Sequence, residues 1–201
     1  MKKEKTAVPK LSRKSRKLLK TAHELFMKHG LRRVTVEEIC READVSKMTF
    51  YKYFDNKSSI ARRVLEDLYE EGWDKFREIF SSSSPLSEKL TKMMMYKMEL
   101  SERCGSEFLR DLMSGGEPEL KEYVEEQTRQ SMQEIERLLQ LAQRSGEIRP
   151  GINTKFMMYM LRALREMFKD DRLLALYDNQ ALLIKDMFTM FYHGVLSDEN
   201  R

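Results

Sequence analysis

The sequence predicts an all-α fold, in which a small N-terminal helix-turn-helix domain is followed by a larger helical domain. Apolar residues recur at helical spacing along most of the 201 residues, and no segment shows the period-two alternation of a β-strand. Ser, Thr, Asn and Pro stand where these helices would begin, and Gly stands where several would end. With 41% apolar residues, the chain can bury a substantial core.

The same spacing and capping residues set the expected order of the helices. The first should start at Ser12 or Ser15 and run to His29, with Gly30 as its stop. Two short helices then open at Thr35 and Ser46. Further helices are expected over 57–80, 85–103, 106–113, 118–145, 153–169 and 179–196, with a short element at 173–177 and a break at Gly115-Gly116.

The two short helices form the most informative stretch. Thr35 and Glu38 have capping-box spacing, and Ser46 is a second N-cap after a turn. Phe50 and Phe54 are four apart, so both should face inward. The outer side of the second helix is then polar, compact and cationic, and such a helix has the size of an element that enters a DNA major groove. A generic pair of packed helices remains the alternative explanation of this spacing.

Charge divides the chain into two parts. Residues 1–57 hold sixteen Lys and Arg against seven Asp and Glu, a net +9, which leaves −5 for the remainder of a total of +4. This asymmetry favours a polyanion as the partner of the N-terminal part. A solubilising basic tail would account for residues 1–17, but it explains poorly the cations inside the structured segment, such as Arg32, Arg33 and Lys52.

The segment from Leu18 to Lys57 resembles the N-terminal domain of the TetR family of bacterial transcriptional repressors. The matching residues keep the order and spacing of the family: Ala22, Leu25, Phe26, Gly30, Thr35, Ile39, Ala43, Val45, Ser46, Lys47, Tyr51, Phe54 and Lys57. Two positions depart from the family. Asp44 replaces the usual turn Gly, and Asp tolerates positive φ better than most residues. Met48 replaces a small residue, and a long side chain there changes how closely the backbone can approach DNA.

The resemblance implies three regions: a disordered basic arm (1–11), a DNA-binding domain (12–56), and a helical ligand-binding and dimerisation domain (57–201). It also implies that the second helix of the motif lies in the major groove. The residues expected to contact DNA are Thr35, Ser46, Lys47, Met48, Thr49, Tyr51, Lys52, Tyr53 and Lys57. Lys and the helix N-termini would hold phosphates, whereas Met48 and Thr49 are placed for base edges. Tyr51 has a second interpretation as a core aromatic residue.

For the larger domain, the resemblance implies a chamber for a small-molecule effector, which remains unknown. The fifteen Met residues suit a roomy apolar pocket, although most of them are equally suited to an ordinary core. The chamber candidates are Trp73, Phe76, Met94, Met98, Phe108, Met113, Tyr123, Met157 and Leu161.

The resemblance further implies a homodimer that reads palindromic double-stranded operator DNA. The helix expected over 179–196 is apolar around most of its circumference, so it needs burial on more than one side. We expect this helix and the one over 153–169 to meet their symmetry mates in a four-helix arrangement. Met187, Phe188 and Phe191 are the expected central contacts.

Several other functions find little support in the sequence. Cys40 and Cys104 lack C-x-x-C spacing, and the three His form no zinc-binding pair, so no metal and no cofactor is expected. No apolar run approaches the ~18 residues of a membrane span, and no signal peptide is visible, which favours a cytoplasmic protein. No enzyme motif is present, although acidic pairs from distant helices are invisible in one sequence. A DNA-coating helical module without an effector is the other alternative.

Overall fold

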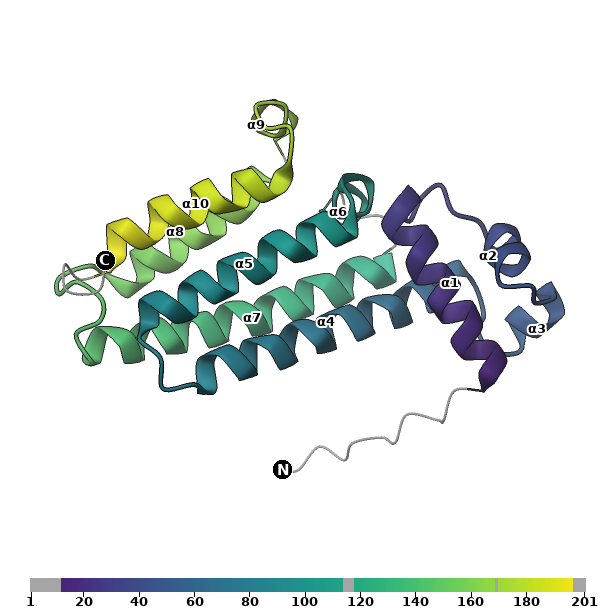
Figure 1. Ribbon diagram of the computed structural model, residues 1–201, viewed down its shortest axis with the longest axis horizontal. Helices are drawn as coiled ribbons and strands as arrows, with labels where there is room; N and C mark the ends of the chain where they lie inside the picture. Colours follow the sequence, from purple (N-terminus) through teal and green to yellow (C-terminus); the bar gives the residue numbers. More distant parts are fainter. Residues whose placement is uncertain (1–11, 114–117, 169, 197–201) are drawn as a thin grey trace.

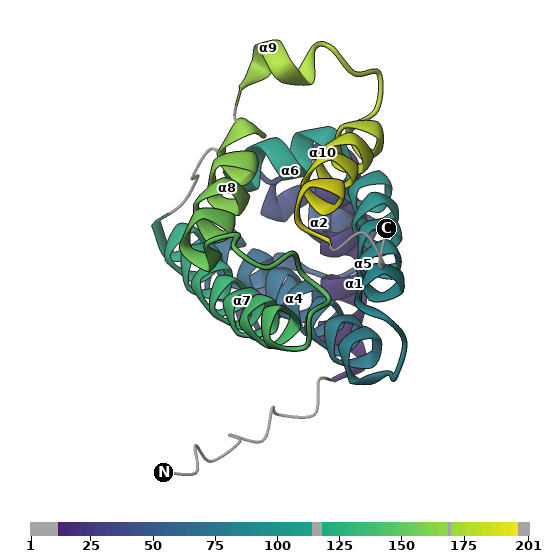
Figure 2. The ribbon, with the colours of Figure 1, turned by 90° about the vertical axis from the view of Figure 1, so that its left-hand side faces the viewer.

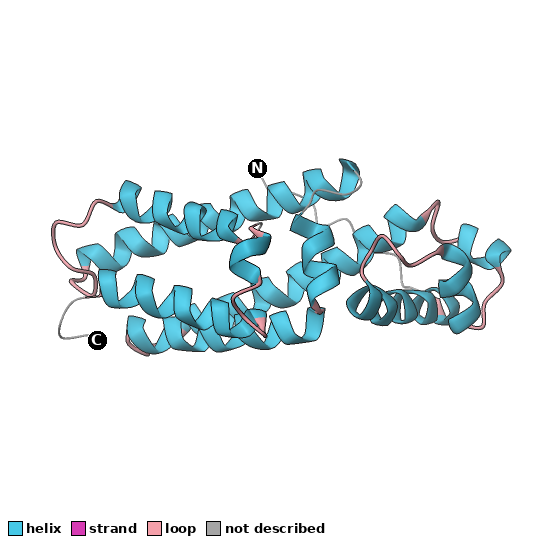
Figure 3. Cartoon of the chain, turned by 90° about the horizontal axis from the view of Figure 1, so that it is seen from above, coloured by secondary structure: helices cyan, strands magenta, loops and turns pink. Residues whose placement is uncertain are grey.

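The protein is described by a computed structural model that covers residues 12–113, 118–168 and 170–196 (Figure 1). These residues form helices and connecting loops (Figure 3), and the one bridge of extended backbone that they contain joins Ile148 to Leu196. The helices are α1 (Arg13–His29), α2 (Val36–Glu42), α3 (Lys47–Tyr51), α4 (Lys57–Ser81), α5 (Leu86–Cys104), α6 (Ser106–Met113), α7 (Pro118–Arg144), α8 (Thr154–Met167), α9 (Asp171–Leu174) and α10 (Gln180–Val195).

The predicted all-α fold is confirmed, and the expected helices are present with small shifts at their ends. Pro85 is the N-cap of α5 and not its first residue, and α9 begins earlier than expected. The predicted arm over 1–11 and the expected break at Gly115-Gly116 lie outside the described residues.

Local capping explains why the N-terminal helices begin and end where they do. The Ser12 hydroxyl accepts from the backbone N–H of Ser15 at 3.1 Å and starts α1. Gly30 ends α1 with a φ of +80°, a conformation that costs glycine little. At α4, Asn56 and Ser59 form a reciprocal capping box.

The core of the N-terminal domain extends beyond the first three helices. Phe26, Ile39 and Phe50 are fully buried there. The same cluster takes in the first turns of α4, and it also includes Phe108 of α6 and Val124 of α7. The helix-turn-helix therefore sits on a base that belongs partly to the larger domain.

The larger domain is elongated, with α4, α5 and α7 running along its length (Figure 1). Seen end-on, α4, α5, α7, α8 and α10 are arranged as a ring (Figure 2). Besides the residues that join the N-terminal core, its buried apolar residues form two clusters, and half-buried Phe80 packs against both. One gathers residues of α7, α8 and α10 around Met157 and Ile148, and the other joins α4 to α5 through Ile79, Met93 and Tyr96.

Helix α6 connects the two domains at close range. The Asp111 carboxylate accepts from the backbone N–H of Arg32 at 3.0 Å, and the Arg32 guanidinium lies 3.5 Å from the same carboxylate. A Cβ added at Gly30 would lie 2.7 Å from an Asp111 oxygen, and one at Gly105 would lie 2.6 Å from the Met27 carbonyl oxygen. Such approaches are shorter than van der Waals contact, so α6 lies against the end of α1 where only glycine fits.

Candidate nucleic-acid interface

The turn between α2 and α3 is built by Asp44. Its φ of +49° is the one positive value at a non-glycine residue of the described chain. The N–H of Val45 bonds the Cys40 carbonyl at 3.0 Å, and the N–H of Asp44 bonds the Arg41 carbonyl at 3.1 Å. This pair of bonds is a Schellman motif, which normally places Gly at the left-handed position. Asp44 therefore supplies the turn that glycine would otherwise supply.

Helix α3 follows this turn at once and presents its outer side to solvent. The Ser46 hydroxyl accepts from the N–H of Thr49 at 3.2 Å, which caps the helix. Phe50 is fully buried, as predicted. Met48 is 85% exposed and Tyr51 is 54% exposed. Met48, which replaces the family's usual small residue, is thus the more exposed of these two side chains of α3. Tyr51 is accordingly not a core aromatic residue.

The cations around α3 differ in their surroundings. Lys47 lies 2.5 Å from the carboxylate of Glu37 on α2. This hydrogen bond lowers the pKa of Glu37 and raises the pKa of Lys47, so the pair is fully ionised near neutral pH. Lys52 is exposed beyond the end of α3. The contact with Glu37 could not be predicted from the sequence, because the two residues are ten apart and on different helices.

Lys57 lies at the first position of α4, and its amine faces the loop between α1 and α2. Its Nζ donates to the Leu31 carbonyl at 2.9 Å and is 3.4 Å from the Arg32 carbonyl. An ammonium has three hydrogens, so one remains for a phosphate. Thr35, the N-cap of α2, is exposed and accepts from the N–H of Glu38 at 3.2 Å.

The predicted chamber residues are distributed over separate parts of the larger domain. Trp73 and Phe76 lie together on α4, with ring centroids 5.6 Å apart, and Trp73 donates to Gln127 of α7 at 3.1 Å. Phe108 and Tyr123 belong to the core shared with the N-terminal domain, whereas Met157 and Leu161 belong to the cluster around α8. Met94 and Met98 are half-buried on α5. The Met113 side chain lies outside the described part of the structure.

The predicted dimer contacts lie on α10, and they differ in exposure. Met187 is buried within its own subunit, whereas Phe188 and Phe191 are half-buried. The apolar side chains that α8 and α10 expose to solvent are others, namely Phe156, Tyr159, Met167, Leu182 and Met190.

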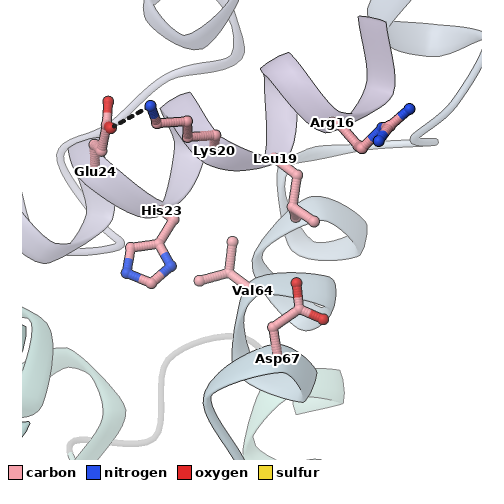
Figure 4. A pocket seen from close by; sticks show the side chains of 7 residues that line it. All are labelled: Arg16, Leu19, Lys20, His23, Glu24, Val64 and Asp67. Atoms are coloured by element: carbon pink, nitrogen blue, oxygen red, sulfur yellow. Dashed lines mark ion pairs between the residues drawn. The ribbon is translucent and has the colours of Figure 1, made fainter. Parts of the chain in front are cut away.

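An open cleft of about 430 Å³ lies between α1 and α4 (Figure 4). Its lining carries charges of both signs, including the pair formed by Lys20 and Glu24 at 3.8 Å. Burial raises the pKa of Asp67 on its α4 side, against the opposing effect of Arg63. The cleft shares no residue with the predicted chamber, and four of its seven lining residues are charged.

The described residues hold neither a metal-binding cluster nor a helix that could span a membrane. No group of three His, Cys, Asp or Glu side chains in that part of the chain is placed to hold a metal ion. Similarly, none of the helices described for the chain has the length and apolar character that a membrane span needs.

The N-terminal region is similar to a known family of proteins. Residues 18–64 match the family described as bacterial regulatory proteins, tetR family. The HTH-type transcriptional repressor KstR2 of Rhodococcus jostii (strain RHA1) is 35% identical over 65 residues, and this match covers 32% of either chain. The chain therefore matches about a third of the length of this relative.

Solved structures resemble the whole fold. SmeT, the repressor of the Stenotrophomonas maltophilia multidrug efflux pump SmeDEF, has a TM-score of 0.72 at 19% identity over 92% of both chains. The transcriptional regulator FadR of Bacillus subtilis, solved in complex with stearoyl-CoA, has a TM-score of 0.67 at 18% identity, covering 88% of this chain and 96% of its own. At these identities the likeness concerns the fold.

Proposed function

We propose, from the premise that this chain belongs to the TetR family of bacterial regulatory proteins, that it is a sequence-specific DNA-binding repressor which a small-molecule effector releases from its operator. The observation that carries the proposal is the outer side of α3. A capped, solvent-exposed helix directly after a tight turn, with Met48 and Tyr51 prominent and Lys47 and Lys52 beside them, has the chemistry of a major-groove reader.

The contacts divide by role. Thr35 and Ser46 stand at helix N-termini, where backbone N–H groups favour a phosphate, and Lys52 and Lys57 add charge. Met48 and Thr49 are proposed to touch base edges, and Tyr51 and Tyr53 to contact the backbone at the margins. The proposal involves no catalytic step.

Two copies are needed to read a palindrome. We assign the dimer contact to α8 and α10, because Tyr159 is 69% exposed, Met190 is 79% exposed, and both helices carry further exposed apolar side chains, as an interaction surface does. Phe188 and Phe191 would contribute from the margin, and Met187 would support them from within the subunit.

The larger domain is proposed to bind the effector. FadR of Bacillus subtilis, a structural neighbour, was solved with stearoyl-CoA, which shows that a protein of this fold accommodates an apolar chain. By reciprocity, the factor by which the effector weakens DNA binding must equal the factor by which DNA weakens effector binding.

Selection of bound DNA from a random pool tests the proposal. The wild type should enrich an inverted repeat, and Met48→Ala should change the preferred bases more than it changes affinity for random DNA. Met95→Ala is the matched control, because Met95 is 62% exposed on α5, far from α3. An unenriched pool would refute sequence-specific binding, and identical selected sequences for Met48→Ala and the wild type would remove Met48 from base reading.

A further inference from the structure

Lys97 occupies an unusual position on α5. It lies four residues after Met93, four before Ser101 and seven before Cys104, so it shares one side of the helix with all three. Those three residues are buried, yet Lys97 is exposed. This exposure indicates that the inward side of α5 borders a space that neighbouring side chains do not fill.

The surroundings of Lys97 agree with such a space. Burial lowers the pKa of its ammonium, although the residue is exposed to solvent. Both observations fit a lysine that faces a solvent-filled space between helices. The larger domain contributes buried apolar residues to three clusters, and Lys97 belongs to none of them.

Lys97 also differs from neighbouring cations in having no carboxylate partner among the described residues. On the same helix Lys92 pairs with Glu88 at 2.6 Å, and Arg103 pairs with Glu71 of α4 at 2.8 Å. Lys97 has only the ring of Tyr96, whose centroid is 6.0 Å from its Nζ. An enclosed cation without an anion is unfavourable, and an incoming anion would remove that cost.

The wall beside Lys97 is aromatic. Tyr96 is buried against Gly72 of α4, and its hydroxyl finds no hydrogen-bond partner within the described part of the chain. Phe76 and Phe80 pack in the same cluster, with ring centroids 4.7 Å apart, and Trp73 continues this row along α4. An orphaned hydroxyl and an unpaired ammonium thus stand next to an apolar surface.

We infer that Lys97 anchors the anionic end of an amphiphilic effector, a carboxylate or phosphate whose hydrocarbon part lies along Phe76 and Trp73. This inference rests on the proposed function, because it takes the larger domain as the effector domain. Neutral and cationic molecules of the same shape are excluded, since the first leave the ammonium unpaired and the second add a like charge.

Intrinsic fluorescence offers a direct measurement, because Trp73 is the single tryptophan of the chain. The full-length protein, without DNA, is titrated with dodecanoate, dodecyl phosphate, dodecanol and dodecyltrimethylammonium. We expect the wild type to bind at least one of the two anions, with an affinity at least about tenfold higher than that for the alcohol or the cation. The stronger of the two anions identifies the effector as a carboxylate or as a phosphate.

Variants test whether Lys97 is the anchor. Lys97→Met should weaken anion binding by at least about tenfold and leave dodecanol binding nearly unchanged, because it removes the charge and keeps the length. Lys97→Arg keeps the charge and should retain the preference for anions. Lys92→Met is the matched control, since it removes an outward-facing, paired lysine from the same helix.

Three results would overturn the inference: no binding of either anion by the wild type, equal binding of anion and alcohol, or unchanged anion binding by Lys97→Met. The thermal unfolding midpoint of each variant is recorded. If Lys97→Met does not fold, the inference is judged from the ratio of anion affinity to dodecanol affinity in the wild type and in Lys97→Arg. DNA binding is not needed for this measurement. Failure of the protein to select a DNA sequence would therefore refute the proposed repressor function separately.

Discussion

At the scale of single residues, the ion pair between Lys47 and Glu37 bears most directly on DNA binding. A DNA phosphate that binds Lys47 must compete with the Glu37 carboxylate, which lies 2.5 Å from the Lys47 Nζ. Both side chains are more than half exposed, so water screens their attraction and the exchange costs little. The pair holds Lys47 against α2 in the free protein and lowers its contribution to DNA affinity.

Removing the competing charge should strengthen DNA binding. Glu37→Gln is expected to raise affinity for all DNA sequences and to increase the magnitude of the log–log salt slope by up to about 1, because one more phosphate contact forms. The measurement is a salt titration of affinity for a fixed duplex. Glu24→Gln is the control, since it makes the same change in net charge on α1. Equal effects of the two substitutions would show that overall charge, and not the release of Lys47, is responsible.

Lys57 shows where reasoning from sequence stops at this scale. Its place at the start of α4 and its charge could be predicted, since Asn56 is a recognisable cap. Its bond to the Leu31 carbonyl could not, because every residue has a carbonyl and this one is 26 residues away in sequence. Lys97 left a signal that could have been used, a lysine among apolar residues on the inward side of a predicted helix.

At the scale of elements, the contact of α6 with the end of α1 joins the two domains in addition to α4, which continues from one into the other. Asp111 holds the backbone of Arg32, and Lys57 holds the carbonyls of Leu31 and Arg32 in the same loop. A displacement of α6 therefore acts on the loop that leads into α2. The close approach at Gly30 leaves no room for α6 to shift toward α1.

Alanine at Gly30 should destabilise the protein for two separable reasons. The combination of φ +80° and ψ 166° is open essentially only to glycine and costs on the order of 1–3 kcal/mol for a residue with a Cβ, and the overlap with Asp111 should add a further ~1–3 kcal/mol. Gly146→Ala is the control for a positive φ without a contact, because Gly146 has a φ of +81° and no atom within 4 Å of an added Cβ. The free energies of unfolding come from urea denaturation. Equal losses in both variants would mean that α6 does not press against Gly30.

The order of the helices could be predicted from the sequence because capping is local. Ser12, Thr35, Ser46 and Asn56 each accept a hydrogen bond from the residue three positions later, and periodicity marked the inward side of the amphipathic helices. The packing of α6 against the N-terminal core could not be predicted, because an apolar residue such as Phe108 could be buried in the core of either domain. Contacts across 79 residues, such as Asp111 with Arg32, have no sequence pattern of their own.

At the scale of the whole molecule, the apolar side chains exposed on α8 and α10 are the proposed dimer surface. Leu182 and Met190 are eight apart and share one side of α10, and Phe156 and Tyr159 are three apart on α8. The sequence predicted that this helix pair would dimerise, but it selected Met187, which the subunit uses for its own core. A helix that is apolar on most sides does not reveal which of them faces inward.

A charge placed on this surface should break the dimer. Tyr159→Glu combined with Met190→Glu is expected to give a monomer in sedimentation at micromolar concentration, because a dimer would have to bury unpaired carboxylates. Met95→Glu, at an exposed methionine of α5, should leave the dimer intact. A dimer that persists in the double variant would place the interface elsewhere.

Footprinting on the operator selected from the random pool tests the central claim, that two copies of α3 read one palindrome. We predict two protected major-groove segments on one face of the duplex, related by inverted symmetry, with centres about 34 Å apart or separated by a further helical repeat. Both should disappear together in the monomeric double variant. Continuous protection without symmetry, or equal protection of a scrambled duplex, would contradict the account.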